Sequence, residues 1–191
     1  MKKQIWSFIF SILWIGSAWS QPVESAKKEW KDTIEKVKSL GVITMGVRES
    51  SGSLSYALWD GKFAGYHVEL CQHIIANLEK TVGKKLEVKY LPVTSQSRIP
   101  LIQNGTIDIE CGSTTNNTAR QKEVSFAFTT YVEEVRIAVK ADSGITSIKQ
   151  LHGRSVVTTA GTISVQTLRK NELAKGLDFK ELLGKDHAES F

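Results

Sequence analysis

Cysteine, methionine and proline are scarce in the 191-residue sequence, which contains two, two and three of them. The two cysteines, Cys71 and Cys111, are too few and too far apart for a C-x-x-C redox motif or a zinc cluster. The four histidines form no H-E-x-x-H or comparable ligand pattern. We therefore expect neither a metal nor another cofactor.

Blocks of basic residues are also missing. Lysine and arginine number 25 against 20 aspartates and glutamates, a formal net charge of +5 at pH 7. No stripe of basic residues with interleaved aromatics is present, so nucleic-acid binding is not expected. The mild positive balance weakly favours anionic small molecules.

No apolar run is long enough for a confident membrane span. Lys2 and Lys3 precede an apolar run over residues 5–16, and small residues follow before Gln21. This pattern predicts a cleaved secretory signal peptide, residues 1–20, and a periplasmic mature protein; an uncleaved anchor is the alternative. Export permits a disulfide. The two cysteines can pair with each other, remain buried thiols or pair with a cysteine elsewhere, and the sequence leaves this open.

The most informative stretch runs from Thr94 to Arg120, where two polar loops bracket a short helix and a strand. One loop carries Ser95 and Arg98, and the other carries Ser113, Thr115 and Arg120. In a helix–strand unit both loops can open at one end of a sheet, where ligands bind in open α/β folds. The guanidinium groups of arginines, together with nearby hydroxyls, suit a carboxylate, because one guanidinium can bond both carboxylate oxygens. Taken singly, each residue also fits a helix cap or solvated surface.

Two further positions are candidates for the same crevice. Arg48 directly follows an apolar strand, so its side chain is either a ligand group or an ordinary strand-end charge. Thr162 follows a strand and precedes a helix, which places free backbone N–H groups at a helix N-terminus. That position is either an anion site or a plain helix cap.

The remaining pattern alternates helices and strands, which indicates an α/β fold with a largely parallel sheet. Helices are expected at 24–40, 66–82, about 98–104, 147–151 and 163–175, and strands at 42–47, 86–90, 107–110, 155–159 and 177–183. An extended run near 126–139 indicates a crossover. We expect a first α/β lobe over 21–131, a crossover or hinge strand over 132–140, and an incomplete second lobe over 141–191, with the chain truncated within that lobe.

Several segments together resemble the periplasmic substrate-binding proteins of amino-acid ABC transporters, within the bacterial extracellular solute-binding proteins of family 3. The segments are Val47–Ser51, Thr94–Thr106, Ile109–Asn117, Arg120–Lys122, Thr159–Thr162 and Lys185–His187. The match is strongest to the glutamate/aspartate-binding branch. It implies a two-lobed, type II periplasmic-binding-protein-like clamshell that closes on its ligand.

The resemblance also implies roles for individual residues. Arg120, Ser113 and Thr115 correspond to groups that hold the α-carboxylate and part of the α-amino group, and Thr162 heads the helix that completes the α-carboxylate site. The groups that bind the side-chain carboxylate of the ligand correspond to Arg48, Ser95, Arg98 and His187. One departure is Ile163, because close relatives carry a hydroxylated residue there. The aspartate that the family sets against the ligand ammonium has no counterpart in this sequence.

The function implied is capture of L-glutamate or L-aspartate and its delivery to the membrane permease of an ABC transporter, by a monomer without catalysis. Two alternatives share the fold: the ligand-binding domain of an amino-acid sensor, and a periplasmic dehydratase-like enzyme. An enzyme needs a positioned acid or base. Only Glu49 and His187 are cleft-side candidates, and neither has an evident orienting partner in the sequence. The preference between glutamate and aspartate is not predicted.

Overall fold

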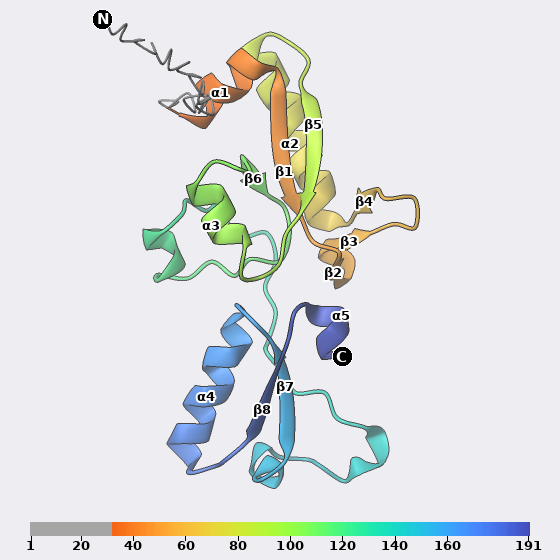
Figure 1. The fold of residues 1–191 in the computed structure, drawn as a ribbon, viewed down its shortest axis with the longest axis vertical. Helices are drawn as coiled ribbons and strands as arrows, with labels where there is room; N and C mark the ends of the chain where they lie inside the picture. Colours follow the sequence, from red (N-terminus) through yellow and green to blue (C-terminus); the bar gives the residue numbers. More distant parts are fainter. Residues whose placement is uncertain (1–31) are drawn as a thin grey trace, which may run out of the picture.

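The computed structural model describes residues 32–191, which form two α/β bodies joined by one long connection (Figure 1). We call residues 32–124 the first lobe and residues 141–191 the second lobe. The predicted signal peptide, residues 1–20, lies outside the described residues. Within the described part, no helix has the length and apolar character needed to cross a membrane.

The first lobe is built on a three-stranded parallel sheet in the order β5 (Glu87–Pro92), β1 (Val42–Val47), β6 (Ile109–Glu110). Val42 pairs with Glu87 at one end of β1, and Met45 pairs with Ile109 on its other side. The bounds of β1 agree with the predicted strand; Ile43, Met45 and Val47 are buried on one face, and Val42 and Thr44 on the other face are partly buried. Since the strands are parallel, their carboxyl ends lie at one edge of the sheet.

Helices α2 (Tyr66–Val82) and α3 (Arg98–Gln103) complete the first lobe together with α1 (Thr33–Leu40). The apolar face of α2 packs on the sheet, as its helical spacing predicts. That helix ends at Gly83, which adopts the left-handed conformation that favours glycine. The fully or nearly fully buried core of this lobe comprises Val37, Ile43, Met45, Val47, Val68, Cys71, Ile75, Val82, Leu86 and Cys111.

The helix expected over residues 24–40 is interrupted at Asp32, and its part over residues 24–31 lies outside the described residues. The described helix begins at Thr33, because the extended Asp32 caps it by accepting a hydrogen bond of 2.7 Å from the Glu35 N–H. Val37 of this helix is buried, whereas Ile34 and Leu40 are exposed.

A small antiparallel sheet lies beside α2 and consists of β2 (Ser50–Ser51), β3 (Ser55–Ala57) and β4 (Phe63–Ala64). A turn that contains Asp60-Gly61 connects β3 to β4, and the two strands form an antiparallel hairpin. Gly65 links this hairpin to α2 at a φ of 128°, and a Cβ there would lie 2.6 Å from the Leu54 carbonyl carbon. Only glycine permits this close approach.

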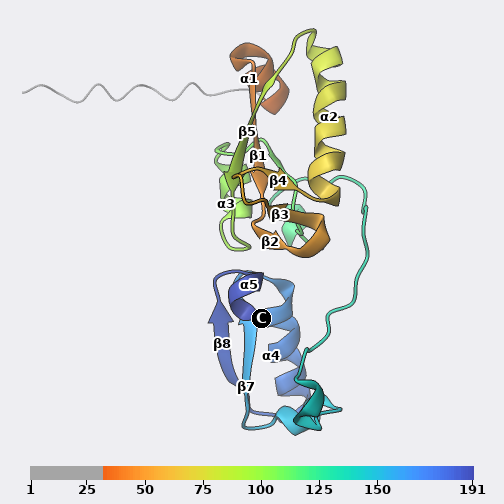
Figure 2. The same cartoon turned by 90° about the vertical axis from the view of Figure 1, so that its right-hand side faces the viewer.

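Residues 125–140 carry the chain from one lobe to the other without an assigned helix or strand (Figure 2). A strand requires a hydrogen-bonded neighbour, and no described segment pairs with this one. Several of its apolar side chains are exposed, including Phe128 and Val132. A hinge strand over 132–140 therefore stays a prediction.

The second lobe holds a parallel pair of strands, β7 (Ser155–Thr159) and β8 (Lys180–Gly184), with helices α4 (Ile163–Lys175) and α5 (His187–Ser190). The bounds of β7 and α4 agree with their predictions. The last strand starts at Lys180, later than expected, because Leu177 closes the end of α4 through a bond to the Glu172 carbonyl. The expected helix at 147–151 is a single 3-10 turn, Ile148–Leu151. A small core forms from Leu151, Val156, Leu168 and Phe179.

Cys71 of α2 and Cys111 at the end of β6 form a disulfide, which resolves the alternatives that the sequence left open. The two residues are 40 positions apart and both are buried. The bond therefore ties the helix to the strand end that leads into the second polar loop.

We expect reduction of this disulfide to destabilise the first lobe. Closing a loop of this length stabilises the folded state by about 4 kcal/mol in the chain-entropy model. Chemical denaturation with and without reductant should show a loss of this order in the free energy of unfolding. A Cys71→Ala/Cys111→Ala variant is the control and should not respond to reductant. Equal stability of the oxidised and reduced protein would contradict a structural role for the bond.

Candidate ligand-binding site

The carboxyl ends of the strands in the two lobes face each other across the middle of the molecule (Figures 1 and 2). In the first lobe these ends lead to Arg48 after β1, Ser95 and Arg98 after β5, and Ser113 after β6. In the second lobe they lead to Thr162 and His187. The fold thus brings loops from both sheets to one place, as open α/β folds do at their ligand sites.

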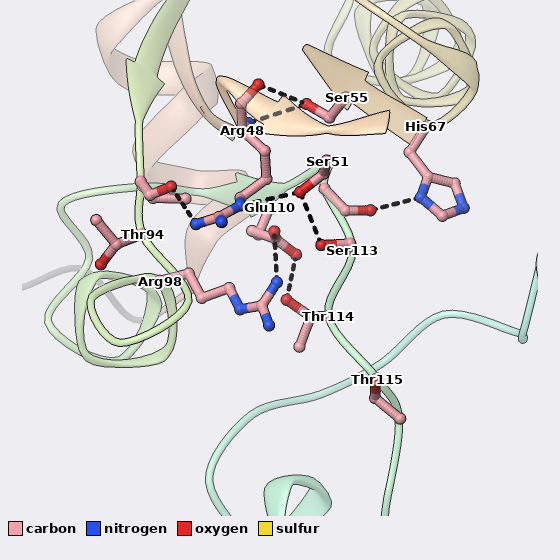
Figure 3. A network of polar contacts seen from close by, with 12 residues as sticks. Arg48, Ser51, Ser55, His67, Thr94, Arg98, Glu110, Ser113, Thr114 and Thr115 are labelled. Carbon is pink, nitrogen blue, oxygen red and sulfur yellow. Dashed lines mark hydrogen bonds and ion pairs between the residues drawn. The ribbon is translucent and has the colours of Figure 1, made fainter. Parts of the chain in front are cut away.

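Arg48 is buried, with 1% of its surface exposed. Its Nη1 donates to the Val93 carbonyl at 2.6 Å, and its Nε donates to the Ser51 Oγ at 3.2 Å (Figure 3). Its Nη2 has no hydrogen-bond partner among the described residues. Burial lowers the pKa of the guanidinium, and nearby carboxylates, Glu110 first, oppose this. One donor of a fixed cation is therefore free.

Arg98 is the first residue of α3 and is 2% exposed. Its Nη1 lies 3.7 Å from the Glu110 Oε1, which is too long for a hydrogen bond (Figure 3). Neither its Nε nor its Nη1 has a hydrogen-bond partner in the described part of the chain. Burial lowers the pKa of Arg98 to about 10; Glu110 opposes the shift, while Arg120 and Arg48 add to it. Arg98 is charged at neutral pH, and its Nε and Nη1 remain available as donors.

The hydroxyl groups beside these arginines differ in what they contact. Ser95 is buried, and its Oγ has no hydrogen-bond partner among residues 32–191. The Ser113 Oγ lies 2.9 Å from the Ser51 Oγ, which in turn contacts Arg48. Thr115 lies farther along the same loop and is exposed (Figure 3). Ser113 is thus joined to Arg48 through one intervening hydroxyl.

Arg120 reaches from the first lobe to the second. Its Nη1 donates to the Thr115 carbonyl at 3.1 Å and its Nη2 to the Gly161 carbonyl at 3.0 Å. Burial lowers the pKa of its guanidinium, whereas Glu110 and Glu123 raise it. Arg120 therefore lies at the junction of both lobes, beside the start of α4.

In the second lobe, Thr162 precedes α4, but its side chain does not cap the helix. The hydroxyl instead donates to the Thr159 carbonyl at 2.7 Å. The first N–H groups of α4 are therefore not occupied by this side chain, which favours an anion at that terminus.

The Thr159 side chain also orients His187. Its Oγ1 lies 2.9 Å from the His187 Nδ1. Burial lowers the pKa of His187 below 6.5, and the positive charges of Arg48 and Arg98 add to this shift. The neutral imidazole is therefore favoured, and its Nδ1 is the nitrogen in contact with the Thr159 hydroxyl.

A cavity of about 460 Å³ lies where the two lobes and the connection meet, within the size range of small-molecule sites. Five of the eight predicted residues line it, namely Arg98, Ser113, Thr115, Thr162 and His187. The other three, Arg48, Ser95 and Arg120, do not line it. Ser164 lines the cavity one position beyond Ile163, so a hydroxyl is present near the place where the sequence lacks one.

Sequence reasoning missed three residues of this region. Glu110 and Thr114 lie between the arginines, and the Thr114 Oγ1 donates to the Glu110 Oε2 at 2.8 Å. His67 contacts the Gly112 carbonyl through Nδ1, and its Nε2 lies 2.8 Å from the Thr130 Oγ1. A charged residue at the end of a half-buried strand was the only sequence signal for Glu110.

The chemistry of the site suits an anion. Within residues 32–191 no group of three or more histidine, cysteine, aspartate or glutamate side chains is placed to hold a metal ion. The convergent groups are three guanidinium groups, hydroxyls and a helix N-terminus, all of which bind carboxylates.

Comparisons with known proteins place this arrangement in a family. The family of bacterial extracellular solute-binding proteins, family 3, matches residues 43–185. An L-glutamate/L-aspartate-binding protein of Pseudomonas aeruginosa is 42% identical over 165 residues, which are 85% of this chain and 55% of the relative. The glutamate/aspartate import solute-binding protein of Escherichia coli K12 is 41% identical, over 83% of this chain and 53% of the relative. The chain thus spans about half the length of these relatives.

Solved structures show the same fold. An ancestral amino-acid-binding protein, described as a precursor of cyclohexadienyl dehydratase, superimposes with a TM-score of 0.71 at 25% identity, over 84% of this chain and 68% of that one. A solute receptor for L-cysteine of Neisseria gonorrhoeae gives 0.67 at 20% identity, over 83% and 61%. These likenesses confirm the predicted α/β fold of the type II periplasmic-binding class. With a family match that covers most of its length, this chain belongs to the bacterial extracellular solute-binding proteins, family 3.

Proposed function

We propose that this protein captures L-glutamate or L-aspartate in the periplasm and delivers it, as a monomer, to the permease of an ABC transporter. The observation that carries the proposal is the convergence of three arginines, two of them nearly fully buried, on the facing strand ends. A dicarboxylate offers two anionic ends to such a set. The printed functions of the relatives from Pseudomonas aeruginosa and Escherichia coli support the same ligand class.

The free donors support a division of the site into two halves. Among the described residues, Arg98 and Ser95 are buried and have donors without a partner, and His187 lines the same cavity as Arg98. We assign these residues, with Arg48, to the side-chain carboxylate. The α-carboxylate is assigned to Arg120, which lies beside the N-terminus of α4. Ser113, Thr115 and Thr162 complete that half.

Binding without catalysis is the reading that the candidate acid–base groups favour. Glu49 is exposed. The Nδ1 of His187 contacts a threonine hydroxyl, whereas a general base is commonly oriented by a carboxylate. Glu49 is therefore solvated, and His187 lacks a hydrogen-bonded carboxylate to orient it as a general base.

The test of the proposed function is a calorimetric panel of amino acids on the purified protein. We expect glutamate or aspartate to bind most tightly and glutamine or lysine at least a hundredfold more weakly, because a neutral or cationic end leaves buried donors unpaired. Equal affinity for glutamate and glutamine would overturn the assignment of the side-chain half.

Substitution of the two arginines should separate the two halves. Arg98→Ala should weaken acidic ligands by about 3 kcal/mol, because a buried ligand charge loses its partner. Arg120→Ala should weaken every amino acid, because all share the α-carboxylate. Arg136→Ala is the control, since this arginine is exposed and pairs with Glu134. If both site variants weaken all ligands to the same degree, the two halves are not distinct.

The affinity for glutamate should also depend on pH through His187. Its pKa is lowered in the free protein, and a ligand carboxylate beside it would raise that pKa. Affinity should then rise as the pH falls through the pKa of the complex, and level off below the pKa of the free protein. Calorimetry in buffers of different ionisation enthalpy, between about pH 5.5 and 8.5, should detect proton uptake that His187→Gln abolishes. Unchanged uptake in that variant would remove His187 from the carboxylate site.

A further inference from the structure

One carboxylate lies among the three arginines of the site. Glu110, the last residue of β6, has a side chain that is only 12% exposed. After burial, its charge is the strongest influence on the pKa of Arg48, of Arg98 and of Arg120. No role in ligand binding follows for it from the sequence or from the division of the site proposed above.

The Glu110 carboxylate is fixed by groups other than the arginines. Its Oε2 accepts a hydrogen bond of 2.8 Å from the Thr114 Oγ1, and its Oε1 packs against Gly112, where any Cβ would collide with it. The Oε1 stays 3.7 Å from the Arg98 Nη1 and has no hydrogen-bond partner among the described residues (Figure 3). Glu110 therefore attracts Arg98 without occupying its Nε and Nη1 donors.

We propose that Glu110 is a fixed internal counter-ion that sets how much negative charge the site accepts from its ligand. It reduces the net charge of the arginine cluster while leaving the Nε and Nη1 donors of Arg98 available. The attraction for every anion is weakened, yet the geometry that selects a carboxylate is unchanged. This inference rests on the proposed function only for the choice of amino-acid ligands.

The physical consequence is an effect that grows with ligand charge. Removing one negative charge from the site adds the same electrostatic attraction for each negative charge that the ligand carries. Glutamine, glutamate and glutarate have net charges of about zero, minus one and minus two at neutral pH. A substitution that only damages the shape of the site would not follow this order.

The first experiment compares these three ligands by calorimetry on wild-type protein and Glu110→Gln, which keeps the shape of the side chain. We expect little change for glutamine, a gain of roughly tenfold for glutamate and a larger gain for glutarate. Glu123→Gln is the matched control, because it removes an exposed charge near Arg120. An equal change for all three ligands, or a greater loss for glutamate than for glutamine, would overturn the proposal.

A second variant tests the fixed position of the carboxylate. Thr114→Val removes the hydrogen bond to the Glu110 Oε2. The Glu110 carboxylate is then free to move and accept hydrogen bonds from the Nε or Nη1 of Arg98. Glutamate should then bind severalfold more weakly, because the carboxylate competes with the ligand. Adding Glu110→Gln to this variant should restore the affinity. If the double variant still binds glutamate weakly, Thr114 acts by another route, and the proposed role of Glu110 as a counter-ion is contradicted.

A third measurement separates failure of this inference from failure of the proposed function. Low-millimolar sulfate should raise the melting temperature of Glu110→Gln more than that of the wild type or Glu123→Gln, whatever the natural ligand is. If wild type binds no acidic amino acid but sulfate stabilises Glu110→Gln selectively, the proposed function fails and the counter-ion stands. Equal stabilisation of all three proteins by sulfate would refute the counter-ion.

Discussion

Holding charged guanidinium groups out of water is the constraint on which the rest of this structure depends. A buried cation carries a desolvation penalty of several kcal/mol that only well-placed partners offset. Arg48 donates to a carbonyl and a hydroxyl, yet its Nη2 has no partner among residues 32–191. Arg98 is paired less well, because two of its nitrogens have no hydrogen-bond partner in that range and the nearby carboxylate is beyond hydrogen-bonding distance. Incomplete pairing of this kind favours the binding of an external anion.

The loop after β6 keeps these charges in position. Cys111 bonds to α2, so the loop leaves the sheet from a covalently tethered point. The next residue, Gly112, lies so close to the Arg48 side chain that a Cβ there would stand 2.5 Å from its Cγ. Arginine, carboxylate and loop backbone are therefore packed together, and the disulfide restrains all three. Stability and ligand geometry are supplied here by the same contacts.

Most of the fold that could be predicted was predicted from local sequence patterns. The strand 42–47 and the helix 66–82 were predicted because a continuous apolar run, helical spacing and a following glycine are visible in a short window. The start of α1 was missed, since Asp32 competes locally as a cap. Whether the connection forms a strand could not be decided locally, because a strand needs a hydrogen-bonded partner from a distant segment. Arginines at strand ends were predicted for a similar local reason. The role of Glu110 was not predicted, because a single acidic residue on a strand differs from a surface charge only once the fold has placed arginines around it.

Contact between the lobes links the charges to the shape of the molecule. Gly161 has a φ of 76°, and a Cβ there would lie 2.7 Å from the backbone nitrogen of Gln96, in the loop that carries Ser95 and Arg98. The carbonyl of the same glycine accepts a hydrogen bond from Arg120. A larger residue at this position would hold the two loops apart, and an anion between them would be exposed to water on one side. Water screens charge interactions strongly. The absence of a side chain at Gly161 thus permits the close approach that the proposed site requires, in which buried arginines from the first lobe and a helix N-terminus from the second contact one ligand.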